Sequence, residues 1–157
     1  MNQGGIELSN TMTIFLIHDY ESSHRGLRSI LSREHDIELV GEATDESEAV
    51  AGVASLQPDV ALLDYCWQHW SGGIEVSKAI RLLAANTKIL VLSAYNDDAY
   101  LASLARLGIN GYLLKSSTPH ELLAALRVVA GNGLVYDPGV SGQVKALLAH
   151  RCDDQRG

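Results

Sequence analysis

The chain is poor in cysteine, with only Cys66 and Cys152 among its 157 residues. These positions fit neither the ligand spacing of a zinc site nor the framework of a disulfide-stapled domain. We therefore expect a protein of a reducing compartment, most simply the cytoplasm.

Long hydrophobic runs are also missing. No stretch reaches the roughly 18 consecutive apolar residues that a membrane-spanning helix needs. The opening MNQGGIELSN lacks the basic start and apolar stretch of a secretory signal peptide. We expect no membrane association, and we interpret residues 1–11 as a polar leader.

Basic residues are outnumbered, with 12 Lys and Arg against 19 Asp and Glu and a net charge of −7. Nucleic-acid binding needs a basic face that neutralises phosphates, so we expect no direct nucleic-acid binding by this chain. The hydrophobic fraction of 46% is ample for a packed core and argues against disorder. The length fits one ordinary domain with some tail.

Five short apolar runs predict β-strands. Most are apolar almost throughout, which is typical of strands covered by helices on both faces. The second run partly alternates with polar residues, which favours a place nearer the sheet edge. The runs are Thr13–Ile17, Ile37–Gly41, Val60–Asp64, Ile89–Ser93 and Gly111–Lys115.

Segments with apolar residues at helical spacing separate these runs and follow the last one. The final segment has the firmest helix start, with Thr118 as N-cap, Pro119 in the first turn and Glu121 closing a capping box. Gly108 stands where a glycine ends the fourth helix. The alternation predicts an α/β fold, a doubly wound five-stranded parallel sheet with helices on both faces.

Ligands of such sheets bind outside the carboxyl ends of the strands. Polar residues stand at four of the five predicted strand ends: His18 with Asp19, Asp64, Ser93 and Lys115. Each alone suits a turn or a cap, but together on one edge they predict a site. Two nearby carboxylates favour Mg²⁺, and a carboxylate beside that ion can attack a phosphoryl group. A lysine and a hydroxyl would then contact the phosphoryl oxygens.

The phrases FLIHDY, LVGEATDESEAV, PDVALLDY and the stretch from ILVLSAYNDD to AGNG resemble the receiver domain of bacterial two-component response regulators. The closest resemblance is to receivers that carry a LuxR-type helix-turn-helix output domain. It covers about Met12 to Gly133 and implies a flavodoxin-like strand order 2-1-3-4-5. We accordingly expect a receiver domain over residues 12–133, followed over 134–157 by a linker or a short helix around Val144–His150 and a tail.

The resemblance implies a role for each matching residue. Asp64 matches the phospho-acceptor that a sensor histidine kinase modifies. Mg²⁺ would be held by Asp19, by Asp64 and by the backbone carbonyl of Cys66. The implied protein is a signalling domain rather than an enzyme, with at most slow self-dephosphorylation.

The resemblance also implies a switch. Ser93 matches the switch hydroxyl, Lys115 the invariant lysine and Tyr112 the switch aromatic residue. On phosphorylation Ser93 would move toward the phosphoryl group and Tyr112 would turn inward. The responding surface would be the fourth helix, fifth strand and fifth helix, a face through which such receivers form homodimers.

Three features depart from the family pattern. His18 stands where an acidic residue usually holds a metal-bound water, so we expect it to border the site and to weaken Mg²⁺ binding. The loop YCWQHWSGG after Asp64 carries Trp67 and Trp70, which suit either a hydrophobic lid or a partner-docking patch. The residues after Gly133 are too few for a helix-turn-helix domain. The chain is then either a stand-alone receiver or a regulator cut at its linker, and in the latter case it would serve transcriptional control.

Three alternatives compete with phosphorylation-dependent signalling. A degenerate receiver would act as an interaction module without phosphorylation, which His18 and the unusual loop favour. A haloacid-dehalogenase-like phosphatase needs a second acid two residues after its nucleophile, where this chain has Cys66. A nucleotide-binding fold fits less well, because no glycine-rich phosphate loop follows the first strand.

Overall fold

The computed structural model describes residues 11–18, 21–65, 72–94 and 98–139, together with positions 142 and 146. Within these residues one parallel sheet of six strands has the order β2-β1-β3-β4-β5-β6. β2 lies at one edge of this sheet, as its partly alternating sequence predicted. The strands are β1 (Met12–His18), β2 (Ile37–Ala43), β3 (Val60–Tyr65), β4 (Lys88–Ser93), β5 (Gly111–Leu114) and β6 (Val135–Tyr136).

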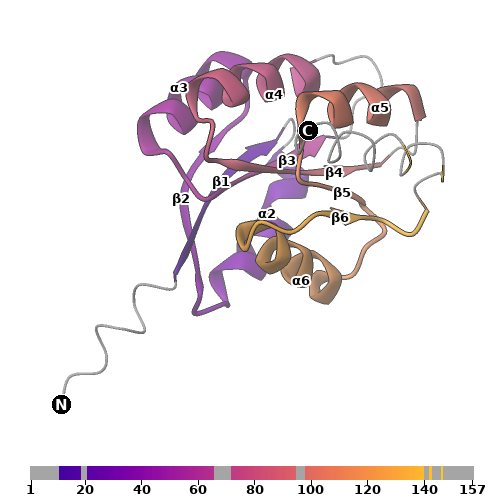
Figure 1. Cartoon of the computed structure of the whole chain (residues 1–157). Helices are drawn as coiled ribbons and strands as arrows, with labels where there is room; N and C mark the ends of the chain where they lie inside the picture. Colours follow the sequence, from indigo (N-terminus) through magenta and orange to yellow (C-terminus); the bar gives the residue numbers. More distant parts are fainter. Residues whose placement is uncertain are drawn as a thin grey trace.

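Helices cover both faces of the sheet, which confirms the predicted doubly wound α/β fold. Figure 1 shows α3, α4 and α5 on one face and α2 and α6 on the other. No helix of the described part of the chain is long and apolar enough to cross a lipid bilayer. The helices are α2 (Glu21–Ser32), α3 (Glu46–Leu56), α4 (Gly72–Leu83), α5 (Asp98–Leu107) and α6 (Pro119–Ala130).

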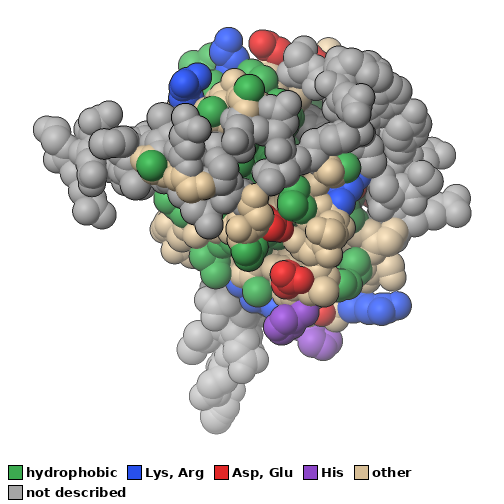
Figure 2. Space-filling model, turned by 90° about the vertical axis from the view of Figure 1, so that its right-hand side faces the viewer, with side chains coloured by type: hydrophobic (Ala, Val, Ile, Leu, Met, Phe, Trp, Pro, Cys, Tyr) green, Lys and Arg blue, Asp and Glu red, His purple; other side chains and the backbone are tan. Residues whose placement is uncertain are grey.

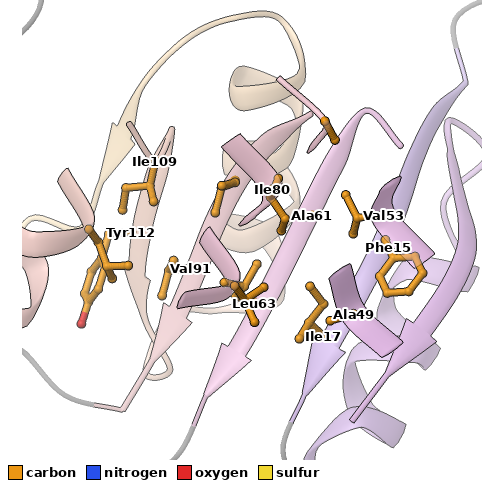
Figure 3. Packing of buried hydrophobic residues seen from close by; sticks show 14 of the residues in the cluster. Phe15, Ile17, Ala49, Val53, Ala61, Leu63, Ile80, Val91, Ile109 and Tyr112 are labelled. Atoms are coloured by element: carbon orange, nitrogen blue, oxygen red, sulfur yellow. The ribbon is translucent and has the colours of Figure 1, made fainter. Parts of the chain in front are cut away.

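The sheet separates two hydrophobic cores. Successive side chains of a strand point to opposite faces, so Phe15 and Ile17 pack under α3 and α4 while Ile14 and Leu16 pack under α2 and α6. Figure 3 shows the first of these cores, with the labelled side chains packed on the sheet. Both faces of the central strands are buried, which is why their sequences are apolar almost throughout.

The ring of Phe15 fixes how closely α3 approaches the sheet. A Cβ atom on Gly41 would lie 2.6 Å from Cε2 of this ring, and one on Gly52 would lie 2.5 Å from the same atom. A glycine on β2 and a glycine on α3 therefore leave the space that the buried aromatic ring occupies.

The predicted helix ends are confirmed. The Thr118 hydroxyl accepts from the Glu121 amide at 3.1 Å, and the Thr118 amide donates to the Glu121 carboxylate at 2.9 Å. Pro119 is the first residue of α6. Gly108, directly after α5, has φ of 90°, a left-handed conformation that glycine adopts without strain.

The expectation of five strands is corrected by β6. This strand pairs with Gly111 and Tyr112 of β5, in the segment that we expected to be linker. With only two residues, it is too short for a periodic pattern to predict. A tight turn returns the chain from α6, with the Gly133 amide donating to the Val128 carbonyl at 2.8 Å.

Other expectations at the chain ends are not covered by the structure. Residues 1–10 of the expected leader lie outside the described residues, as does the helix expected around Val144–His150 except for one position. The strand expected to end at Lys115 ends at Leu114, and Lys115 begins the turn that follows.

Candidate functional site

Asp64 lies at the carboxyl edge of the sheet, near the end of β3. The strand lies between β1 and β4, and Asp64 is the register partner of His18 on β1. The residue is only 1% exposed. Burial of a carboxylate is costly unless charged or hydrogen-bonding groups compensate it, so the surroundings of Asp64 must supply such groups.

Lys115 supplies a compensating charge. Its Nζ atom lies 2.6 Å from Oδ1 of Asp64, and its side chain is 21% exposed. The Lys115 amide donates to the Ser93 carbonyl at 2.8 Å, which fixes the backbone of the turn against the end of β4. The structure thus brings the predicted phospho-acceptor and the predicted lysine into direct contact.

Ser93 and Tyr112 lie on the face of the sheet that α3, α4 and α5 cover. Ser93 is buried at the end of β4, and Tyr112 is fully buried in the core of that face. Figure 3 shows Tyr112 beside Val91 and Ile109. The ring is buried in this structure, and the switch role that the sequence analysis assigned to Tyr112 stays a prediction.

Tyr100 of α5 packs against the same core. Its burial, and then the charge of the neighbouring Tyr112, raise the pKa of Tyr100 to about 12. Tyr100 therefore stays neutral at physiological pH, and the two tyrosines link β5 to α5.

His18 is buried at the end of β1 and contacts β2 as well as β3. Its Nε2 atom lies 3.3 Å from Oε1 of Glu42, and Arg28 of α2 lies 2.6 Å from Oε2 of the same carboxylate. The hydrogen bond from Arg28, and more weakly the one from His18, lower the pKa of the Glu42 carboxyl, although burial opposes them. The ionised Glu42 thus holds the imidazole beside the Asp64 strand.

Sequence reasoning missed Glu42 and Arg28. The only signal was a polar residue near the end of the second strand, and the contact with α2 depends on the tertiary structure. No pattern in the sequence joins Arg28 to a residue on the next strand.

The other predicted metal ligands, Asp19 and Cys66, lie outside the described residues, as do Trp67, His69 and Trp70. Over the ranges that the structure describes, no three His, Cys, Asp or Glu side chains lie close enough to hold a metal ion. The structure shows one buried carboxylate, Asp64, which is paired in register with His18, the last residue of β1. Asp19 follows His18 in the sequence. Carboxylate oxygens are the donors that Mg²⁺ prefers, so this part of the site fits the ion.

The pattern of the response regulator receiver domain matches residues 14–127. The chain belongs to this family. Response regulators are the signalling components of two-component systems, where they are paired with histidine kinases. The family membership confirms the resemblance found in the sequence.

Two curated relatives of this receiver are transcriptional regulatory proteins. It is 35% identical to the transcriptional regulatory protein LiaR of Bacillus subtilis, over 87% of this chain and 64% of LiaR. It is 32% identical to the transcriptional regulatory protein DegU of Brevibacillus brevis, over 84% of this chain and 56% of DegU. The chain thus spans less than two thirds of the length of these relatives.

Solved receiver structures share the fold. The receiver domain of NarL from Mycobacterium tuberculosis has 30% identity and a TM-score of 0.70, with 78% of this chain and 98% of that one covered. The isolated receiver domain of RcsB from Salmonella enterica, determined with the phosphomimetic BeF₃⁻, has 25% identity and a TM-score of 0.71, with 88% and 99% covered. This receiver is therefore similar to those of LuxR-type regulators.

Proposed function

We propose that this receiver accepts a phosphoryl group on Asp64 from a sensor histidine kinase. The observation that carries the proposal is the buried Asp64 carboxylate at the tip of β3, with the Lys115 ammonium 2.6 Å away. A carboxylate placed on a rigid central strand can act as a nucleophile, and the adjacent cation balances the charge that a phosphoryl group adds.

The transfer follows from this arrangement. An oxygen of Asp64 forms a bond to phosphorus while the bond between phosphorus and the kinase imidazole nitrogen breaks, which leaves an acyl phosphate. Lys115 holds a phosphoryl oxygen as negative charge accumulates. Asp19, Asp64 and the Cys66 carbonyl would hold Mg²⁺, which when bound would neutralise charge on the phosphoryl oxygens.

The proposed output is a change at the protein surface. The added charge draws Ser93 toward the phosphoryl group, and the core around Tyr112 transmits this movement to α5, β5 and α6. β6 lies along part of β5, so it forms part of the surface that responds. A homodimer through this face is the proposed readout.

Transcriptional control in the cytoplasm is the proposed biological role, because LiaR and DegU are transcriptional regulators. We propose no direct nucleic-acid contact by this chain. On the face drawn in Figure 2, the Lys and Arg side chains of the described residues are scattered among acidic and apolar ones. A scattered distribution of this kind does not make the basic patch that phosphates require.

A phosphorylation-independent interaction module is the competing function. The observation that favours it is His18 at the edge of the site, where the imidazole binds Glu42 and supplies no negative charge for a cation. In that case the same surface would bind a partner regardless of the state of Asp64.

Intact mass spectrometry separates the two functions. Incubation with Mg²⁺ and a small phosphodonor should add the mass of one phosphoryl group to the parent and none to Asp64→Asn, and chelation of Mg²⁺ should prevent the addition. A parent protein that gains no mass under these conditions would support the interaction module.

A further inference from the structure

β6 binds to β5 beside the turn that carries Lys115. The Asp137 amide, directly after β6, donates to the Tyr112 carbonyl at 2.8 Å. The Tyr136 hydroxyl donates to the Ile109 carbonyl at 3.3 Å. Backbone and side-chain hydrogen bonds therefore fix this segment along β5, with Asp137 at the end nearest the turn.

The Asp137 carboxylate bridges the two ends of that turn. Its Oδ2 atom accepts from the Leu114 amide at 3.1 Å and from the Ser117 hydroxyl at 3.3 Å. Its Oδ1 atom accepts from the Gly139 amide at 3.0 Å. Leu114 directly precedes Lys115, and Ser117 follows it by two residues, so one carboxylate oxygen spans the segment from which the lysine projects.

Three other restraints act on the same turn, and one of them is the hydrogen bond that the Ser117 amide donates to the Leu114 carbonyl at 2.9 Å. On one side the Lys115 amide binds the Ser93 carbonyl, and on the other the capping box at Thr118 fixes the start of α6. Asp137 adds a restraint from the chain that follows α6. Its contacts of 3.1 Å and 3.3 Å join both ends of the turn to β6, which none of the other restraints does.

We propose that Asp137 is a positioning residue for Lys115. Its carboxylate holds the turn between β5 and α6 in the geometry in which the lysine ammonium reaches Asp64. The consequence for phosphorylation rests on the proposed function, whereas the effect on the ion pair concerns the unmodified protein.

The same contacts couple β6 to the state of Asp64. A phosphoryl group that binds Lys115 changes the turn, and the turn contacts Asp137 through Leu114 and Ser117. Because such coupling is reciprocal, phosphorylation of Asp64 changes how firmly β6 binds to β5. The binding of the chain after α6 therefore depends on whether Asp64 carries a phosphoryl group.

The test compares Asp137→Ala, Asp137→Asn and the matched control Tyr136→Phe. Tyr136→Phe removes a β6 hydrogen bond at the other end of β5 and leaves the turn contacts intact. Two measurements on the unmodified proteins report positioning: hydrogen exchange of the Leu114 amide and the ¹⁵Nζ resonance of Lys115. A third is the rate of phosphorylation by a small phosphodonor with Mg²⁺.

In Asp137→Ala we expect exchange of the Leu114 amide to accelerate about tenfold, the Lys115 resonance to move, and phosphorylation to slow about tenfold. Asp137→Asn keeps a carbonyl oxygen that can face the Leu114 amide, so it should restore most of all three values. Tyr136→Phe should match the parent. Ser117→Ala alone should have a smaller effect, and it should add nothing to Asp137→Ala.

An Asp137→Ala protein with the parent's Lys115 resonance would overturn the proposal, even if its phosphorylation were slow, because the loss would then be merely structural. Equal defects in Asp137→Asn and Asp137→Ala would also overturn it. If no variant and no parent protein is phosphorylated, the proposed function fails, while the exchange rates and the lysine resonance still decide the role of Asp137.

Discussion

Replacement of Lys115 by methionine removes the ammonium group next to Asp64 and keeps an unbranched side chain. The Asp64 side chain is only 2% exposed, so in the variant its charge would have no partner and little access to water. Either the unpaired charge or the uptake of a proton that removes it costs free energy. Loss of one partner from a fully buried pair costs about 3–5 kcal/mol. The Lys115 side chain is 21% exposed, and solvent screening reduces that cost. We expect Lys115→Met to lower the free energy of unfolding by about 2 kcal/mol at neutral pH.

Urea unfolding of four proteins tests this value: the parent, Lys115→Met, Asp64→Asn and the double variant. Asp64→Asn removes the buried negative charge, so Lys115→Met should cost less than about 0.5 kcal/mol in that background. The coupling energy of the cycle should therefore be about 1.5 kcal/mol or more. An equal cost of Lys115→Met in both backgrounds would refute the inference that the ion pair offsets the burial of Asp64.

Three further changes have expected outcomes. Arg127 lowers the pKa of the Asp36 carboxyl, mainly through its hydrogen bond. Because the pair is exposed, this hydrogen bond stabilises the fold by less than about 1 kcal/mol. The stabilisation is present above the unfolded pKa of Asp36, about 3.9, and is lost as the pH falls through the lower pKa of the folded state. In urea unfolding, Arg127→Met should have a lower free energy of unfolding than the parent at pH 7, and this difference should shrink in acid. A difference that does not change with pH would contradict the role of the Asp36 pKa. Gly52→Ala should lower the free energy of unfolding by about 1 kcal/mol in the same assay, because overpacking against Phe15 outweighs the better helix propensity of alanine. A stabilised variant would contradict the packing argument. Phosphorylated Ser93→Ala should dimerise more weakly than the phosphorylated parent by about 1–3 kcal/mol in sedimentation, and equal dimerisation would exclude Ser93 from the relay.

The sequence predicted the features that depend on local patterns. The apolar runs located five strands because helices bury both faces of the central ones, and Thr118 located the start of α6 because a capping box is confined to four residues. The polar residues at four of the five predicted strand ends pointed to the carboxyl edge of the sheet, where Asp64 and Lys115 lie. Asp64 and Lys115, which were predicted to belong to one site, are in contact in the fold.

What the sequence could not predict depends on contacts between distant segments. β6 has two residues and forms only because the turn after α6 delivers it to the edge of β5. Asp137 resembles an ordinary turn residue before a proline, and only the folded chain places it against Leu114. The contact between His18 and Glu42 likewise joins neighbouring strands through side chains that no periodicity links.

The central claim is that Asp64 is the residue that carries the phosphoryl group. The most direct measurement is reduction of the freshly phosphorylated protein with borohydride, which converts an aspartyl phosphate to homoserine, followed by peptide mass spectrometry. We expect homoserine at position 64 only when Mg²⁺ and the phosphodonor were both present. Homoserine at another aspartate, or a protein that gains phosphate without any reducible acyl phosphate at position 64, would contradict the account.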